Sequence, residues 1–187
     1  MQRICEDTQI CHAILRGKSN LHLFEEEIQK MKILDAAEKS KKEQQTQVLA
    51  YCVLDNEVHL LVRTRVTGET ESFLEQIRSR YQTALPEDSG AKGKSIFKKD
   101  SFSEVKNIES AAQCARKLHL LPVKRKMTER PEDYWWSSYT DYMGRKWIGL
   151  ADTGELLHRY GQDARKAAAS MRRDYQKYLI EKGAKFR

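Results

Sequence analysis

Two side chains that can ligate a metal, Glu57 and His59, stand two residues apart in a short apolar segment. This segment is expected to form a strand over residues 57–64, in which alternate side chains point to the same face. Glu57 and His59 then share one face with Leu61 and Arg63. A carboxylate and an imidazole at this spacing can reach one divalent cation, either Mg²⁺ or Mn²⁺. The pattern therefore predicts either a weakly held divalent metal or, alternatively, a packed histidine with no cofactor.

The elements that must position this pair follow from the apolar periodicity on either side of it. Period-two runs predict strands, and apolar residues at helical spacing predict helices, with Asn107 as the N-cap of one of them. The strands are expected at 10–16, 48–54, 57–64 and within 95–105, and the helices at 23–42, 70–85, 107–120, 152–160 and 163–182. Residues 86–94 have the composition of a mobile loop.

This order of elements predicts an α+β fold. A strand, a helix, a strand pair, a helix and a strand are typical of a ferredoxin-like sandwich, which is an antiparallel sheet with helices on one face. We expect this domain to span residues 1–127. Residues 128–187 should add a segment rich in Trp and Tyr and a C-terminal helical extension, both packed on the core.

The composition narrows the class of protein. The chain has 187 residues, of which 40% are hydrophobic and 33% charged, as expected for a globular domain with a core of its own. No apolar run is long enough to cross a membrane, and the N-terminus lacks the pattern of a signal peptide, so we expect a cytoplasmic protein with no membrane partner. The net charge of +7 is compatible with a polyanionic partner.

Four segments in order carry a resemblance to a known family. Residues 11–17 resemble its opening strand Tyr-His-Val-x-x-Arg-Gly, and residues 50–62 resemble Ala-Tyr-Cys-Leu-Met-Pro-Asn-His-Val-His-Leu-Leu. Residues 129–139 resemble Arg-Pro-Glu-Asp-Tyr-x-Trp-Ser-Ser-Tyr, and residues 151–161 resemble its closing helices. The family is that of the IS200-like, REP-associated tyrosine transposases, which belong to the HUH endonuclease superfamily.

The resemblance implies an activity and also indicates its loss. Family members hold a divalent metal with two histidines and a third polar ligand, and a tyrosine attacks the scissile phosphate. In this chain Glu57 stands in place of the first histidine, Lys117 in place of the tyrosine and Leu121 in place of the third ligand. A lysine cannot form the phosphotyrosine link and a leucine cannot ligate a metal. We therefore expect a degenerate member in which no intact catalytic residue set remains.

Basic residues recur beside the segments that resemble the nuclease core. As a group they suggest phosphate contacts with DNA, although each alone is commonly a solvated charge. The candidates for DNA binding are Arg16, Lys18, Arg63, Arg78, Arg80, Lys98, Lys99, Lys117, Lys124, Arg125 and Lys126. For Lys117 the two interpretations are a solvated helix residue and a phosphate contact in the old active site.

Tyrosines and tryptophans elsewhere have competing interpretations as well. Tyr81, Tyr139 and Tyr142 could be proposed as substitute nucleophiles, but the helical phase of Tyr81 favours the core. Trp135, Trp136 and Tyr139 are expected to pack the C-terminal segment onto the sheet, with stacking on an unpaired base as the alternative.

Three functions remain open from the sequence. The first is a DNA-binding, transposase-like protein that recognises single-stranded or hairpin DNA without cutting it. The second is a metal-dependent single-strand nuclease or transposase with a variant site at Glu57 and His59. The third is a protein-interaction module that has kept only the fold. The family resemblance is compatible with either a monomer or a homodimer.

Overall fold

The computed structural model describes residues 8–18, 21–66, 68–87, 95–145 and 148–182. The strands are β1 (Gln9–Arg16), β2 (Gln47–Val53), β3 (Glu57–Thr64) and β4 (Ser101–Glu104). The helices are α1 (Glu27–Gln44), α2 (Glu69–Thr83), α3 (Ile108–His119), α4 (Leu121–Lys124), α5 (Tyr139–Tyr142), α6 (Gly154–His158) and α7 (Ala164–Glu181), with a 3₁₀ turn, η2 (Pro131–Asp133). The loop predicted at 86–94 falls mostly on residues 88–94, outside the described residues.

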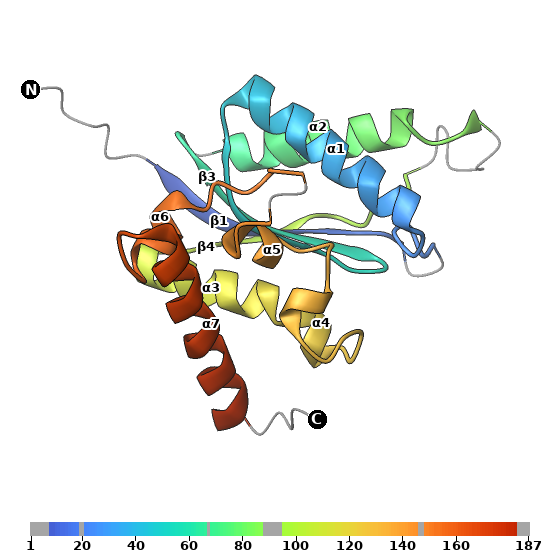
Figure 1. Cartoon of the computed structure of the whole chain (residues 1–187). Coiled ribbons are helices and arrows are strands. Elements are labelled where there is room, and N and C mark those ends of the chain that lie inside the picture. Colours follow the sequence, from blue (N-terminus) through green and yellow to red (C-terminus); the bar gives the residue numbers. More distant parts are fainter. Residues whose placement is uncertain (1–7, 19–20, 67, 88–94, 146–147, 183–187) are drawn as a thin grey trace, which may run out of the picture.

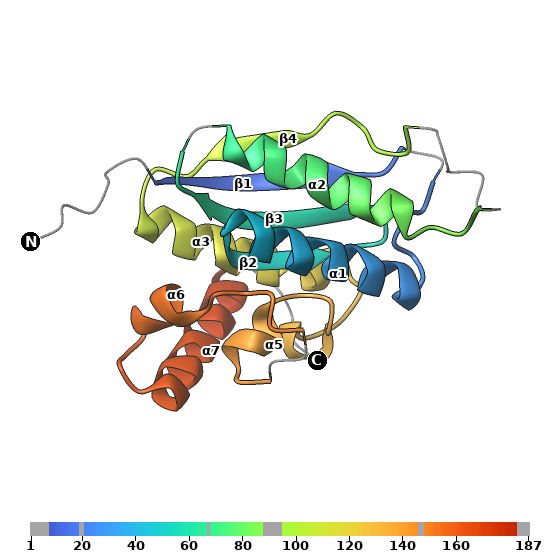
Figure 2. The ribbon, with the colours of Figure 1, turned by 90° about the horizontal axis from the view of Figure 1, so that it is seen from above.

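The four strands form one sheet in the order β2-β3-β1-β4, and every pair is antiparallel. This is the strand order of a ferredoxin-like sandwich, so the predicted α+β fold is confirmed. Helices α1 and α2 cover one face of the sheet (Figure 1). Helix α3 lies against the opposite face over β2 and β3 (Figure 2), so that one helix of the core faces the other two across the sheet.

Burial along β1 shows how the two faces differ. Cys11, Ala13 and Leu15 are buried beneath α1 and α2, whereas His12 and Ile14 between them are half-buried. The alternation follows from the strand geometry, which sends successive side chains to opposite faces. Because α3 lies over β2 and β3, the α3 side of β1 remains partly exposed to solvent. Polar side chains gather on this part of the sheet.

The C-terminal segment adds backbone contacts to the outer edge of β2. Val53 N donates to Trp136 O at 2.8 Å and Ser138 N donates to Tyr51 O at 3.0 Å. Further along the same edge, Asp152 N donates to Val48 O at 2.7 Å. One cluster of buried apolar side chains includes residues of the sheet and of this segment. The segment therefore pairs the edge strand and closes the core beside α3.

Candidate nucleic-acid interface

Two histidines and one carboxylate form a hydrogen-bonded chain on the α3 face of the sheet. His12 Nε2 lies 3.2 Å from His59 Nδ1, and His59 Nε2 lies 3.1 Å from Glu57 Oε2. The two imidazole rings are stacked with their centroids 5.4 Å apart. The register explains this contact, because His59 pairs with Ile14 and His12 is the next residue of β1 on the same face. Neighbouring antiparallel strands thus bring residues 47 positions apart into contact.

The chain of hydrogen bonds determines the histidine tautomers. A carboxylate only accepts, so His59 donates from Nε2 to Glu57. Its Nδ1 then accepts a hydrogen bond from His12 Nε2. Burial is the main cause that lowers the pKa of His12 to about 4, and the nearby His59 and Lys117 side chains also disfavour its protonation. Burial also lowers the pKa of His59, and Glu57 offsets only part of that effect. Both imidazoles are therefore neutral at pH 7.

Glu57 binds two guanidinium groups in addition to His59. Arg16 Nε donates to Glu57 Oε1 at 2.9 Å, and Arg125 donates to Glu57 Oε2 at 3.1 Å. Arg16 is the direct cross-strand partner of Glu57, whereas Arg125 follows the short helix α4. Burial by itself raises the pKa of the Glu57 carboxyl, but the hydrogen bonds from Arg16 and His59 outweigh it and hold the pKa below its ordinary value.

Lys117 and Leu121, which the sequence resemblance aligns with a nucleophile and a third metal ligand, lie on α3 and at the start of α4. Lys117 is exposed on α3, close enough to His12 for its charge to lower the pKa of that histidine. Leu121 is half-buried and apolar. Within the described residues, no three His, Cys, Asp or Glu side chains form a group that could hold a metal ion. The metal assignment to Glu57 and His59 stays a prediction.

A hollow of about 490 Å³ opens at the end of the sheet beside this cluster. Its walls come from the end of β1, the turn between β2 and β3, the segment before β4 and the chain after α4. Four basic side chains reach it: Arg16, His22, Lys98 and Arg125. Asp55 also lines the hollow, but its carboxylate forms an ion pair with the buried Lys30 at 3.2 Å. Apart from the Asp55–Lys30 pair, the hollow is lined by the permanent cations Arg16, Lys98 and Arg125 and by the single carboxylate of Glu57, so its net charge is positive.

The other predicted DNA contacts are distributed over different parts of the surface. Arg63 lies on the same sheet face as His59, but its guanidinium binds both carboxylate oxygens of Glu155 in α6. Arg78 forms ion pairs with Glu75 and Asp100, on the side of the sheet covered by α2. Arg80 pairs with Glu43 on α1, and Lys99 lines a second hollow together with Arg78 and Lys98. Lys124 lies over the Tyr178 ring. Lys18 and Lys126 are exposed.

Only part of the predicted set therefore converges. Arg16, Lys98 and Arg125 meet at the hollow, and Lys117 lies close enough to His12 for its charge to act on that histidine. The sequence reasoning did not select His12 or His22 as site residues. Alternation along 10–16 would have placed His12 on the face of Arg16, and antiparallel pairing with 57–64 would then have placed it beside His59. No comparable signal exists for His22, which reaches the hollow from a loop.

The aromatic residues occupy two kinds of environment. Tyr81, Tyr139 and Trp136 are buried, as expected for core residues. Trp135 instead exposes 48% of its surface, so it lies at the surface rather than in the core, and its packing onto the sheet stays a prediction. Its neighbour Trp136 faces the core while its carbonyl accepts from β2.

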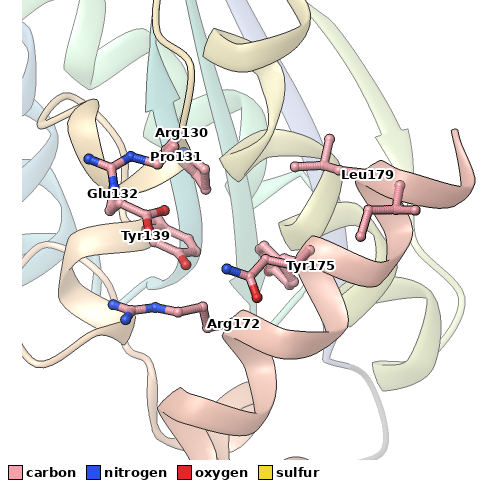
Figure 3. Close-up of a pocket in the computed structure, with 9 residues that line it drawn as sticks. Arg130, Pro131, Glu132, Tyr139, Arg172, Tyr175 and Leu179 are labelled. Carbon is pink, nitrogen blue, oxygen red and sulfur yellow. The ribbon is translucent and has the colours of Figure 1, made fainter. Parts of the chain in front are cut away.

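A separate cavity lies between α7 and the segment 130–139 (Figure 3). Tyr139, Tyr175 and Leu179 form an apolar wall, and Arg130 and Arg172 stand at its margin. Arg130 pairs with Asp133 at 2.9 Å, so little of its charge is available to a ligand. The cavity is about 160 Å³, smaller and more apolar than the hollow beside Glu57. The hollow is thus the better site for a polyanion.

Comparison with known proteins tests the fold. No protein-family model matches the chain, and no curated protein matches it. Among solved structures, a REP-associated tyrosine transposase bound to a REP hairpin is similar, with a TM-score of 0.58 and 16% sequence identity. The likeness covers 80% of this chain and 85% of that chain. The fold relationship indicated by the four sequence segments is therefore confirmed. Within the described residues, no helix is long and apolar enough to span a membrane.

Proposed function

We propose that this protein binds single-stranded or hairpin DNA and has lost the strand-transfer chemistry of the transposases whose fold it shares. The observation that carries the proposal is the positively charged hollow beside Glu57, where Arg16, Lys98 and Arg125 converge. Guanidinium and ammonium groups at this density suit a phosphate backbone. The protein of shared fold is bound to a REP hairpin, which supports a hairpin as the partner.

The same site supports the loss of catalysis. A phosphotyrosine intermediate requires an accessible phenol near the metal position, and Lys117 occupies the helix position expected for it. Tyr81, Tyr139 and Tyr142, considered above as substitutes, are 0%, 1% and 2% exposed. Their hydroxyl groups therefore cannot reach a phosphodiester without opening the core. Exposed bases would supply any sequence preference, while the cations supply affinity.

Fluorescence anisotropy with matched DNA ligands tests the proposal. A hairpin with unpaired flanks, the same sequence as a linear single strand and its fully paired duplex are titrated over a range of salt concentrations. We expect tighter binding to the hairpin or the single strand than to the duplex, with an affinity that falls steeply as salt rises. Equal binding to all three, or no salt-sensitive binding, contradicts the proposal.

Catalysis is tested in a separate assay. Labelled strands are incubated with the protein in Mg²⁺ or Mn²⁺, and the products are separated under denaturing conditions. We expect neither cleavage nor a covalent protein–DNA adduct. Cleavage would instead support the variant metal-dependent site at Glu57 and His59.

A further inference from the structure

The carboxylate of Glu57, which was expected to ligate a metal, is already occupied by hydrogen bonds from other side chains. Both oxygens of Glu57 accept hydrogen bonds from side chains, from Arg16 on one oxygen and from Arg125 and His59 on the other. A divalent cation at Glu57 would have to displace two guanidinium groups and stand beside their positive charges. The donor set at this position therefore does not fit a divalent metal.

The geometry points instead to a metal-independent phosphate site, in which Glu57 positions Arg16 and Arg125. We propose that these two guanidinium groups bind a phosphate group of DNA directly, in the hollow beside Glu57, and that they supply the positive charge that a metal supplies in the related transposases. This inference rests on the proposed DNA-binding function, which it extends by naming the group bound.

The hydrogen bonds leave donors for such a ligand. A guanidinium has five N–H groups, and within the described part of the chain Arg16 and Arg125 each donate one side-chain hydrogen bond, to Glu57 in both cases. The side chains are 40% and 57% exposed, so their remaining donors can face the hollow. Two guanidinium groups held on one carboxylate have little rotamer freedom left to lose on binding.

The charges around the pair also favour an anion. Lys98 lines the same hollow, and the only carboxylates among its described lining residues are Glu57 and Asp55. Asp55 is paired with Lys30, which is 5% exposed. The unpaired part of the hollow therefore holds one carboxylate, Glu57, against the three cations Arg16, Arg125 and Lys98, and a bound phosphate would bring its charge closer to balance.

The direct test measures DNA binding with and without metal. Anisotropy of the hairpin is recorded with the wild-type protein in excess EDTA and in Mg²⁺ or Mn²⁺. We expect dissociation constants that agree within about twofold, because phosphate contacts by arginine need no cation bridge. Binding that disappears in EDTA overturns the inference, although the proposed DNA-binding function would then stand.

Two variants test the roles of the residues. R125Q should weaken hairpin binding about tenfold, the usual effect of one lost charge-assisted hydrogen bond, and should reduce the salt slope by about one. E57Q should also weaken binding severalfold although it makes the protein more positive, because the guanidinium groups lose their common anchor. Tighter binding by E57Q would show that Glu57 competes with the phosphate and would overturn its positioning role.

A matched control and a second ligand separate this inference from the proposed function. R173Q removes the same charge from α7, a helix that contributes no residue to the lining of the hollow. It should change the affinity by less than about twofold. Inorganic phosphate should raise the melting temperature of the wild type but not of R125Q, whereas chloride at equal ionic strength should not. If phosphate stabilises the protein and no DNA binds, the phosphate site stands and the DNA-binding function fails. If phosphate has no effect on the wild type, the site itself is refuted.

A 5′-phosphorylated strand and its 5′-hydroxyl counterpart distinguish the two sources of the phosphate. A preference for the phosphorylated strand that R125Q abolishes assigns the site to a terminal phosphate. Equal binding of the two strands, still weakened by R125Q, assigns it to an internal phosphodiester. Loss of the R125Q effect in both strands overturns the inference.

Discussion

Two regions of the molecule use histidine in opposite ways. His12 is half-buried and His59 is buried on the α3 face of the sheet, where their hydrogen bonds lead through Glu57 to two half-exposed arginines. His119 lies at the end of α3 with no exposed surface. Its Nδ1 contacts the Tyr175 hydroxyl at 3.0 Å and its Nε2 contacts the Ser138 hydroxyl at 2.7 Å.

The difference shows which kind of hydrogen-bonded histidine cluster leaves charge available to a ligand. Around His119 the rings of Tyr139, Tyr142 and Tyr175 lie within 6 Å between centroids, and both ring nitrogens have hydroxyl partners. The polar groups are satisfied internally, which makes this cluster a structural element. At the sheet face the last partners are arginines that still reach solvent. The His119 cluster therefore stabilises the fold, whereas the cluster of His12, His59 and Glu57 has positive charge available for a ligand.

Tyr142→Ala should produce the largest effect and should act on stability alone. Tyr142 is 2% exposed, and its hydroxyl donates to Leu49 O at 2.6 Å. Truncating a buried aromatic ring leaves a cavity and an unpaired carbonyl, so we expect a loss of about 3–5 kcal/mol in the free energy of unfolding. Urea denaturation followed by circular dichroism measures it. Hairpin affinity of the folded fraction at low temperature should stay unchanged, and a large change in affinity would contradict the separation of the two regions.

His119→Gln should alter the pH dependence of stability. Burial lowers the pKa of His119 from 6.5 to about 3. Below pH 6.5 the unfolded chain binds a proton that the folded chain does not take up, so the free energy of unfolding falls as the pH drops toward 3. The slope is at most about 1.4 kcal/mol per pH unit for one group. Urea denaturation at a series of pH values should show a shallower slope for the variant.

His12→Gln provides the comparison for that experiment. The pKa of His12 is lowered to about 4, so its contribution should be confined to pH values between about 4 and 6.5. His119→Gln should therefore remove the slope between pH 3 and 4 that His12→Gln retains. Identical pH profiles for the two variants would contradict the difference in burial.

Lys117→Ala should weaken hairpin binding with little loss of stability. Lys117 is exposed and its charge acts on His12, so its removal deletes one cation from the proposed DNA surface. We expect an affinity about three- to tenfold lower and a salt slope reduced by about one. Lys177→Ala is the matched control, because Lys177 is an exposed lysine on α7 paired only loosely with Glu181. An equal loss in both variants would indicate a diffuse charge effect.

Arg63→Gln should have the smallest effect. Its guanidinium binds Glu155, with 20% and 43% of the two side chains exposed, so we expect a stability loss below about 1 kcal/mol. Arg63 lies six residues along β3 from Glu57, about 20 Å away, and its charge is already paired. Anisotropy should give an affinity within about twofold of the wild type. A loss as large as that of R125Q would extend the DNA surface along the whole strand.

Local patterns predicted most of the elements. Alternation and helical spacing placed β1, β3, α2 and α3 within two residues of their observed ends, and the Asn107 side chain accepts from Ser110 N as its N-cap assignment requires. The strand expected within 95–105 is reduced to four residues at 101–104. Its first part forms only an isolated bridge between Phe97 and Gly17, so no continuous ladder forms there.

The sequence by itself determined which face of β3 carries Glu57 and His59, because the side-chain period of a strand is a local property. Through the family resemblance it also predicts that Lys117 and Leu121 stand where the related transposases carry the nucleophile and the third metal ligand. Only the tertiary structure decided what Glu57 contacts. Arg16 is 41 residues away and Arg125 is 68 residues away, and strand register and the turn after α3 bring them together. Such contacts depend on long-range packing, which residue types and spacing along the chain do not specify.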